Sequence, residues 1–254
     1  MSQKNRDGKR GARERLQEQR QQEAARAKRR RTLVAAAVVA GVLAVAAAIG
    51  VVVANTGGED EGPVASPKGA GGENGLVLSK GRADAPATLT VYEDFRCPAC
   101  KQFEDTYRST IDSLVKSGDL RVDYHLVTII DGNVGGQGST RAANAAACSQ
   151  DAGHFPEYHD VLFANQPPET EDAFADNGRL LKLADKVDGL RSGAFDSCVE
   201  KGTYEDWVAR SSSTLTDDGY NSTPTVLLDG KDVYSGGRLT PESLKKQVED
   251  AARS

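Results

Sequence analysis

Two cysteines, Cys97 and Cys100, are separated only by Pro98 and Ala99. This C-x-x-C spacing suits two kinds of chemistry: exchange between a dithiol and a disulfide, or supply of half of a tetrahedral zinc site. A zinc site needs two further ligands, usually from a second close pair. The two possibilities therefore differ in whether the chain contains such a pair.

No second close pair of zinc ligands follows the motif in the sequence. The other cysteines, Cys148 and Cys198, are 50 residues apart. His125 falls in an alternating run and is interpreted as a strand residue, whereas His154 and His159 are five residues apart and do not share a helix face. The sequence thus favours a redox pair and predicts no metal ligands.

The residues that flank the motif predict a strand followed by a helix. A β-prone run begins at Thr88 and ends at Cys97, and Gly118 then marks the end of a helical pattern. Proline suits the first helical position because the N–H that it lacks has no partner there, which makes Cys97 the N-cap residue. The apolar stripe of this helix comprises Phe103, Tyr107, Ile111, Leu114 and Val115.

This placement makes the two cysteines unequal. Cys97 adjoins the unpaired N–H groups and the positive end of the helix, which lower the pKa of a thiol, so it is the candidate nucleophile. Cys100 precedes Phe103 by three residues on the buried stripe. It is therefore the candidate resolving thiol, shielded from substrate but close enough to attack a mixed disulfide on Cys97.

Charge is distributed unevenly along the 254 residues. The first 31 residues carry twelve basic and four acidic side chains, although the whole chain has 32 Lys plus Arg against 37 Asp plus Glu. The remainder is acidic and poor in aromatic residues, which argues against a nucleic-acid-binding domain. Four cysteines are also too few for a small disulfide-rich scaffold.

An apolar run from Leu33 to Ala54 is long enough to span a membrane. Basic residues precede it and acidic residues follow it, so the N-terminus is expected in the cytoplasm. We predict a basic cytoplasmic tail over 1–31, a transmembrane helix over 32–54, a flexible linker over 55–75 and a folded extracytoplasmic domain over 76–254. A cleaved secretory signal is the alternative to the anchor.

Three segments of the chain resemble the DsbA-like branch of the thioredoxin superfamily, most closely its membrane-anchored, single-domain actinobacterial type. These segments are 92–100, 155–166 and 219–230. The resemblance implies an α/β thioredoxin fold with an inserted helical domain over about 139–218. Asp229–Gly230 fits a hairpin turn leading to Val233–Tyr234, and Thr240–Pro241 fits the start of a last helix.

The resemblance also implies a substrate-binding element at Thr223 and Pro224. In that family, the proline of a matching Thr-Pro pair is cis and faces the two cysteines, and a small trans preference makes such a bond plausible. The Thr223 backbone would then pair with an extended substrate strand beside Cys97. A plain turn before a strand is the alternative.

Two further pairs of residues carry predictions. Cys148 and Cys198 fall in the helical insertion and are predicted to form a structural disulfide, with two separate buried thiols as the alternative. Many thioredoxin-fold enzymes bury an acid six residues before the nucleophile, but Val91 occupies that position. Glu93 and Asp94 are candidates for such a proton relay, although exposed carboxylates beside the site are the simpler interpretation.

Together these features predict a membrane-tethered thiol:disulfide oxidoreductase that introduces disulfides into secreted or cell-surface proteins. We expect a monomer that needs no cofactor and is reoxidised by a quinone-linked membrane protein of the DsbB or VKOR kind. Ala99 replaces the histidine found in the strongest oxidants of the family, which leaves the direction of transfer open. A reductase or isomerase of the same fold, or a non-enzymatic peptide-binding holdase module, are the alternatives.

Overall fold

The computed structural model describes residues 64–253. Within them, five strands form one sheet in the order β1-β3-β2-β4-β5. β2 and β3 are parallel, while β1 and β4 are antiparallel to their inner neighbours. The strands are β1 (Leu78–Lys80), β2 (Ala87–Glu93), β3 (Leu120–Leu126), β4 (Thr225–Leu228) and β5 (Lys231–Asp232).

The central strands follow the period of two expected for a sheet with unequal faces. In β3, Leu120, Val122, Tyr124 and Leu126 are buried and the residues between them are half-buried. His125 lies on the opposite face, as predicted for a strand residue, and stacks on Tyr92 with 4.2 Å between ring centres. The buried residues of β3 therefore all lie on one face of the sheet, and this face packs into the core that contains the cysteine motif.

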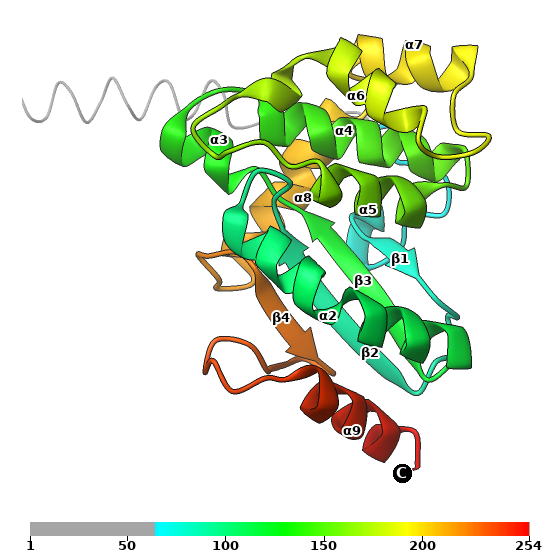
Figure 1. Cartoon of the computed structure of the whole chain (residues 1–254), viewed down its shortest axis with the longest axis vertical. Helices are drawn as coiled ribbons and strands as arrows, with labels where there is room; N and C mark the ends of the chain where they lie inside the picture. Colours follow the sequence, from blue (N-terminus) through cyan, green and yellow to red (C-terminus); the bar gives the residue numbers. More distant parts are fainter. Residues whose placement is uncertain (1–63, 254) are drawn as a thin grey trace, which may run out of the picture. The chain divides into compact units, whose positions relative to one another are not determined.

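α2 (Pro98–Ser117) crosses that face of the sheet and begins at the motif (Figure 1). Pro98 is its first residue, and Gly118 ends it in the left-handed conformation with φ 84°, donating its N–H to the carbonyls of Leu114 and Val115. A residue with a Cβ is strained at this φ, which explains the glycine. α9 (Pro241–Ala251) is capped by Thr240 and packs beside α2.

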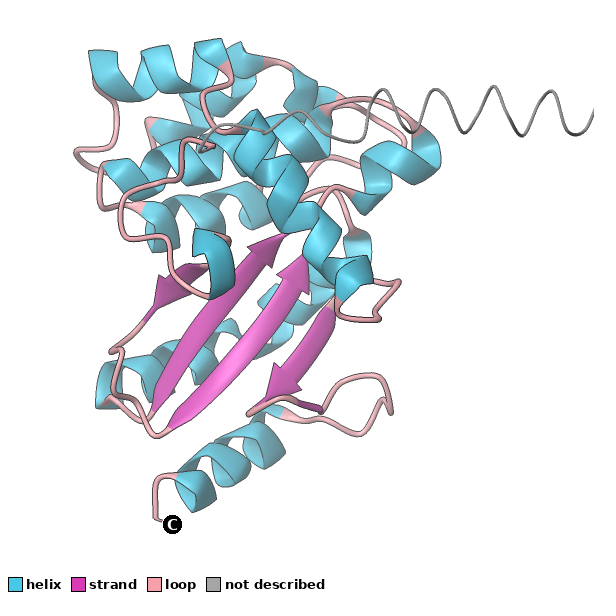
Figure 2. Cartoon of the chain, turned by 180° about the vertical axis from the view of Figure 1, so that it is seen from behind, coloured by secondary structure: helices cyan, strands magenta, loops and turns pink. Residues whose placement is uncertain are grey.

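A helical region, residues 129–217, lies between β3 and β4 in the chain. Its helices are α3 (Ile129–Val134), α4 (Gly138–Asp151), α5 (Phe155–Ala164), α6 (Asn177–Ala184), α7 (Gly193–Lys201) and α8 (Glu205–Asp217), with the 3-10 turn η2 (Ala173–Ala175) before α6. α3 to α7 gather beyond the carboxyl ends of β2 and β3, and α8 returns behind the sheet (Figures 1 and 2). A disulfide joins Cys148 of α4 to Cys198 of α7.

The connections make this a thioredoxin fold interrupted by the helical region. The thioredoxin core consists of β2-α2-β3 followed by β4-β5-α9. α4 is the centre of the helical region because five of its alanines are buried, which lets neighbouring helices approach closely. The helical region begins at Ile129, ten residues before the predicted Ser139, because α3 precedes the alanine-rich segment.

The folded part also begins earlier than the predicted start at Leu76. Val64 and Ala70 pack against the core, and Gly71 pairs with Val77 in a β-bridge. The carbonyl of Lys68 accepts a hydrogen bond from Gln150 Nε2 at 3.0 Å. The linker prediction over 55–75 is therefore wrong for residues 64–75. It depended on their low apolar content, whereas backbone groups and a few small side chains hold these residues against the domain.

The hairpin after β4 is tighter than predicted. Asp229 and Gly230 both have positive φ, so β5 starts at Lys231 rather than at Val233. The predicted transmembrane helix over 32–54 lies outside the described residues. Within residues 64–253, no helix combines the length and apolarity that crossing a bilayer requires.

Candidate active site

The strand β2 and the loop after it deliver Cys97 to the N-cap of α2. Residue Cys97 is 6% exposed and residue Cys100 is 1% exposed. Both are free thiols. Cys97 Sγ lies 3.5 Å from the carbonyl oxygen of Thr223, which belongs to the segment before β4. The first cysteine is therefore the one that faces the surface and a second chain segment.

The surroundings shift the pKa values of the two thiols in opposite directions. The Cys100 thiol hydrogen-bonds Cys97, and this contact, with further bonds from the Thr223 side chain and the Ala99 and Cys100 N–H groups, outweighs burial and lowers the pKa of Cys97 to about 6. Burial, reinforced by the neighbouring Cys97 sulfur, raises the pKa of Cys100 well above its ordinary value. At neutral pH the pair therefore holds one thiolate, at Cys97, and one thiol.

A groove of about 700 Å³ passes the motif at Ala99. The Thr223–Pro224 peptide, which is cis, forms part of its wall. Tyr220 and Tyr234 also line it, so the wall combines aromatic rings with backbone polar groups. A larger groove of about 1130 Å³ is lined by residues of the sheet, of α8 and of the segment before β1; it shares Tyr220 with the first groove and contains no motif residue.

Two side chains fix the loop that carries Cys97. Gln166 donates from Nε2 to the carbonyls of Phe95, at 2.9 Å, and of Cys97, at 3.0 Å. Arg96 is 2% exposed and donates to Asp131 Oδ1 at 2.6 Å, to the Gly135 carbonyl and to the Glu169 carbonyl. The helical region therefore holds the nucleophile's own backbone in place.

The interpretation of Glu93 and Asp94 as exposed carboxylates is wrong, since both are fully buried. Asp94 accepts hydrogen bonds from the N–H groups of Arg96, at 2.8 Å, and Ile130, at 2.9 Å. Desolvation raises the pKa of Asp94 to about 7. The helical region covers this end of β2, and the polarity of the residues near Glu93 and Asp94 in the sequence does not predict that cover. A proton-relay role for these two residues stays a prediction.

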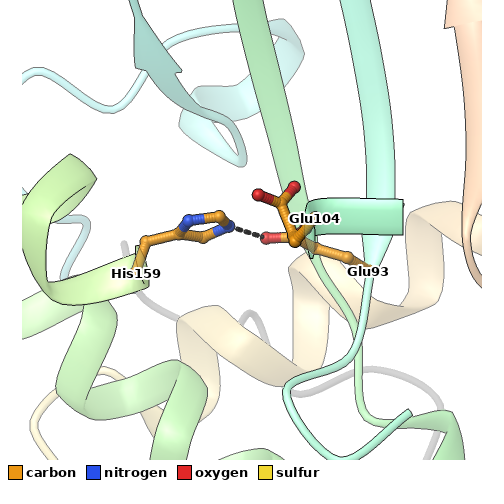
Figure 3. A group of neighbouring side chains, drawn as sticks. All are labelled: Glu93, Glu104 and His159. Atoms are coloured by element: carbon orange, nitrogen blue, oxygen red, sulfur yellow. Dashed lines mark hydrogen bonds and ion pairs between the residues drawn. The ribbon is translucent and has the colours of Figure 1, made fainter. Parts of the chain in front are cut away.

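Sequence reasoning missed two residues that meet Glu93 inside the molecule. His159 of α5 places Nε2 at 2.6 Å from Glu93 Oε1, and Glu104 of α2 lies beside this pair (Figure 3). Burial raises the pKa of Glu104 to about 7. Burial opposes protonation of His159, but the charge of Glu93 prevails and raises its pKa to about 10. The only signal for Glu104 is its position one turn after Cys100.

Comparisons with known proteins agree with this architecture. The thioredoxin family model matches residues 74–250. Disulfide bond formation protein D of Bacillus subtilis is 27% identical over 154 residues, which cover 59% of this chain and 67% of that protein. The crystal structure of reduced DsbA from Mycobacterium tuberculosis matches with a TM-score of 0.60 at 28% identity, and the match covers 70% of this chain and 93% of the DsbA chain.

A further relative places the same type of domain within a longer protein. The serine/threonine-protein kinase PknE of Mycobacterium tuberculosis is 30% identical over 166 residues. That match covers 61% of this chain but 29% of the kinase. The fold, the paired thiols and these similarities agree: this chain belongs to the thioredoxin family and is a DsbA-like thiol:disulfide oxidoreductase.

Proposed function

We propose that this protein is a membrane-tethered, extracytoplasmic thiol oxidase that passes a Cys97–Cys100 disulfide to secreted or cell-surface proteins. The observation that carries the proposal is the inequality of the two sulfurs. Cys97 has a pKa of about 6 at the end of a helix, whereas the pKa of the buried Cys100 is raised. Such a pair presents one sulfur to substrate and keeps the other for resolution.

The proposed reaction is a pair of thiol–disulfide exchanges. A substrate thiolate attacks Cys97 Sγ, the bond to Cys100 breaks, and the Cys100 sulfur leaves and takes up a proton. A second substrate thiolate then attacks the substrate sulfur of the mixed disulfide and releases Cys97 as a thiolate. The substrate loses two electrons in forming its disulfide, and the Cys97–Cys100 pair gains them.

The depressed pKa of Cys97 favours this direction because it stabilises the reduced enzyme. A shift from 9.0 to about 6 is worth on the order of 4 kcal/mol above pH 9. Since the folded-state pKa is the lower one, this stabilisation shrinks as pH falls from 9 and is lost below about 6. The groove at Thr223 and Pro224 is the proposed binding site for an extended substrate segment.

Two features support an extracytoplasmic location. The disulfide between Cys148 and Cys198 suits an oxidising compartment. The apolar run from Leu33 to Ala54, preceded by basic residues, suits a signal anchor with the N-terminus in the cytoplasm. In this arrangement a quinone-linked membrane protein of the DsbB or VKOR kind would reoxidise the enzyme at the membrane surface.

The test is the redox equilibrium of the full chain, purified in detergent, against glutathione buffers. Thiols are trapped by acid and alkylation and located by mass spectrometry. We expect Cys97 and Cys100 to cycle at a potential well above the roughly −270 mV of thioredoxin, with Cys148–Cys198 intact throughout. A potential at or below that of thioredoxin would make the protein a reductase, and failure to cycle would support the peptide-binding alternative.

A further inference from the structure

A cluster of two carboxylates and one imidazole is enclosed where the thioredoxin core meets the helical region. Glu93 ends β2, Glu104 lies on α2 and His159 lies on α5. Their exposed fractions are 0%, 2% and 1%. One donor atom from each lies within 4.8 Å of the donors of the other two (Figure 3). The three residues come from three separate elements and converge on one point.

The cluster leaves oxygen atoms without hydrogen-bond partners. Among the described residues, Glu93 Oε2 and Glu104 Oε1 are buried and accept no hydrogen bond. The other oxygen of Glu104, Oε2, lies 3.5 Å from Arg108 Nε. A buried carboxylate oxygen with no partner is costly, and coordination of a cation is one of the few ways to satisfy it.

The histidine is held in the way that metal-ligating histidines are held. Its Nδ1 lies 3.2 Å from Asp160 Oδ1, while its Nε2 points at the two glutamates. Histidines that ligate metals commonly donate their second ring N–H to a carboxylate, which fixes the tautomer. Because the pKa of His159 is raised to about 10, its Nε2 carries a proton at neutral pH, and an ion bound at Nε2 would displace that proton. Asp160 is in turn paired with Arg108 at 3.1 Å.

Charge and donor type indicate the class of ion. Once the imidazolium proton has been released, a divalent cation with two carboxylates and a neutral imidazole has no net charge, which suits a buried site. An imidazole nitrogen favours Zn²⁺ and similar transition metals over Ca²⁺ or Mg²⁺, which prefer oxygen alone. The rings of Tyr124, Phe155, Phe163 and Phe95 pack against His159, so the imidazole has aromatic neighbours.

We propose that Glu93, Glu104 and His159 bind one divalent transition-metal ion, with Zn²⁺ the best match, in a closed structural site that fastens α5 to β2 and α2. The 2.6 Å between His159 Nε2 and Glu93 Oε1 is a hydrogen-bond distance. An ion roughly 2.1 Å from each donor holds them about 3 to 3.4 Å apart, so binding requires side-chain shifts of about 1 Å. The sequence hides the site because its members are far apart in the chain.

The test uses the full chain in detergent with Cys97→Ser and Cys100→Ser, so that no free thiol competes for the ion. The protein is stripped with a chelator, equilibrated with Zn²⁺ and analysed for bound metal and for thermal unfolding. We expect one equivalent of Zn²⁺ and a higher Tm with the ion present. Glu104→Gln and His159→Gln should each lose the bound ion, and Asp160→Asn should weaken affinity by roughly 10- to 100-fold.

Matched controls lie on the same helix as His159. Glu157→Gln removes an exposed carboxylate and His154→Gln removes the N-cap histidine, and both variants should keep the ion. X-ray absorption of the Zn²⁺-loaded parent should show nitrogen or oxygen ligands at about 2.0–2.2 Å together with the outer-shell scattering of one imidazole ring, a result that does not depend on whether a variant folds. Absence of stoichiometric Zn²⁺, or Zn²⁺ retained in both Glu104→Gln and His159→Gln, would overturn the proposal.

Discussion

The thiol at Cys97 owes its reactivity to its neighbours, above all to the thiol of Cys100. That hydrogen bond is the largest contribution lowering the pKa of Cys97, ahead of those from the Thr223 side chain and the helix N–H groups. The positive end of the helix favours the thiolate at the N-cap position, but a hydrogen-bond donor that points at the sulfur lowers the pKa of the thiol further. Cys100 therefore does more than form the disulfide with Cys97: it also lowers the pKa of the Cys97 thiol.

The alkylation rate of reduced Cys97 should follow a titration with a midpoint near pH 6, falling as pH drops below this value because the thiolate is lost. Cys100→Ala should raise the midpoint because it removes the donor. Cys100→Ser keeps a hydroxyl donor and serves as the matched control, with a midpoint nearer to that of the parent. Rates of iodoacetamide labelling measured from pH 4 to 9 provide the check, and equal midpoints in the two variants would contradict this account.

The junction between α5 and η2 acts on the start of α2. Gln166 lies two residues after the end of α5 and donates to the carbonyls of Phe95 and Cys97, so one side chain joins the helical region to the loop that carries the nucleophile. Arg96 adds a second connection from within that loop. The N-cap geometry of Cys97 thus depends on elements about 70 residues away in the chain.

Gln166→Ala should lower the free energy of unfolding by about 1–3 kcal/mol, because it leaves two largely buried carbonyls without their donor. Urea denaturation followed by circular dichroism measures the change. The matched control is Gln150→Ala, which removes an exposed bond from a glutamine to the Lys68 carbonyl and should cost less than about 0.5 kcal/mol. Equal effects of the two substitutions would show that the hydrogen bonds of Gln166 do not stabilise the loop that carries Cys97.

At the scale of the whole molecule, residues 64–253 form a thioredoxin core whose site is completed by an inserted helical region. The core supplies the motif and the Thr223–Pro224 segment, while the insertion supplies Gln166 and His159. The disulfide between Cys148 and Cys198 closes a 50-residue stretch inside the insertion. Stability of the insertion and order at the site are therefore expected to be linked.

Replacing both Cys148 and Cys198 with alanine should lower the free energy of unfolding by about 4 kcal/mol, the loop-closure entropy of a 50-residue loop. Denaturant titration of the full chain measures this loss. The labelling midpoint of Cys97 should stay near pH 6 under native conditions, because none of the groups that lower the pKa of Cys97 belongs to the bridge. A change in stability below about 1 kcal/mol would mean that the bridge constrains the unfolded chain little.

Local features of the chain were sufficient to predict the strand before the motif, the start and end of α2 and the inequality of Cys97 and Cys100. Each depends on neighbours within one or two helical turns: Pro98 at the first position, Gly118 at a left-handed C-cap and the apolar stripe between them. The presence of a helical insertion between two strands was implied by the family resemblance and not by these local features. The strand, the two ends of α2 and the unequal placement of the cysteines are properties that periodicity and capping encode directly.

Tertiary structure alone decided the burial of Glu93 and Asp94, the contact between Glu93 and His159, and the hydrogen bonds from Gln166 to the loop that carries Cys97. The paired atoms of Glu93 and His159 belong to residues 66 positions apart, and those of Gln166 and Cys97 to residues 69 apart. A polar residue looks exposed when only its neighbours in sequence are considered. Its solvation is set by whichever distant helix packs over it, and that depends on how the whole insertion folds back onto the sheet.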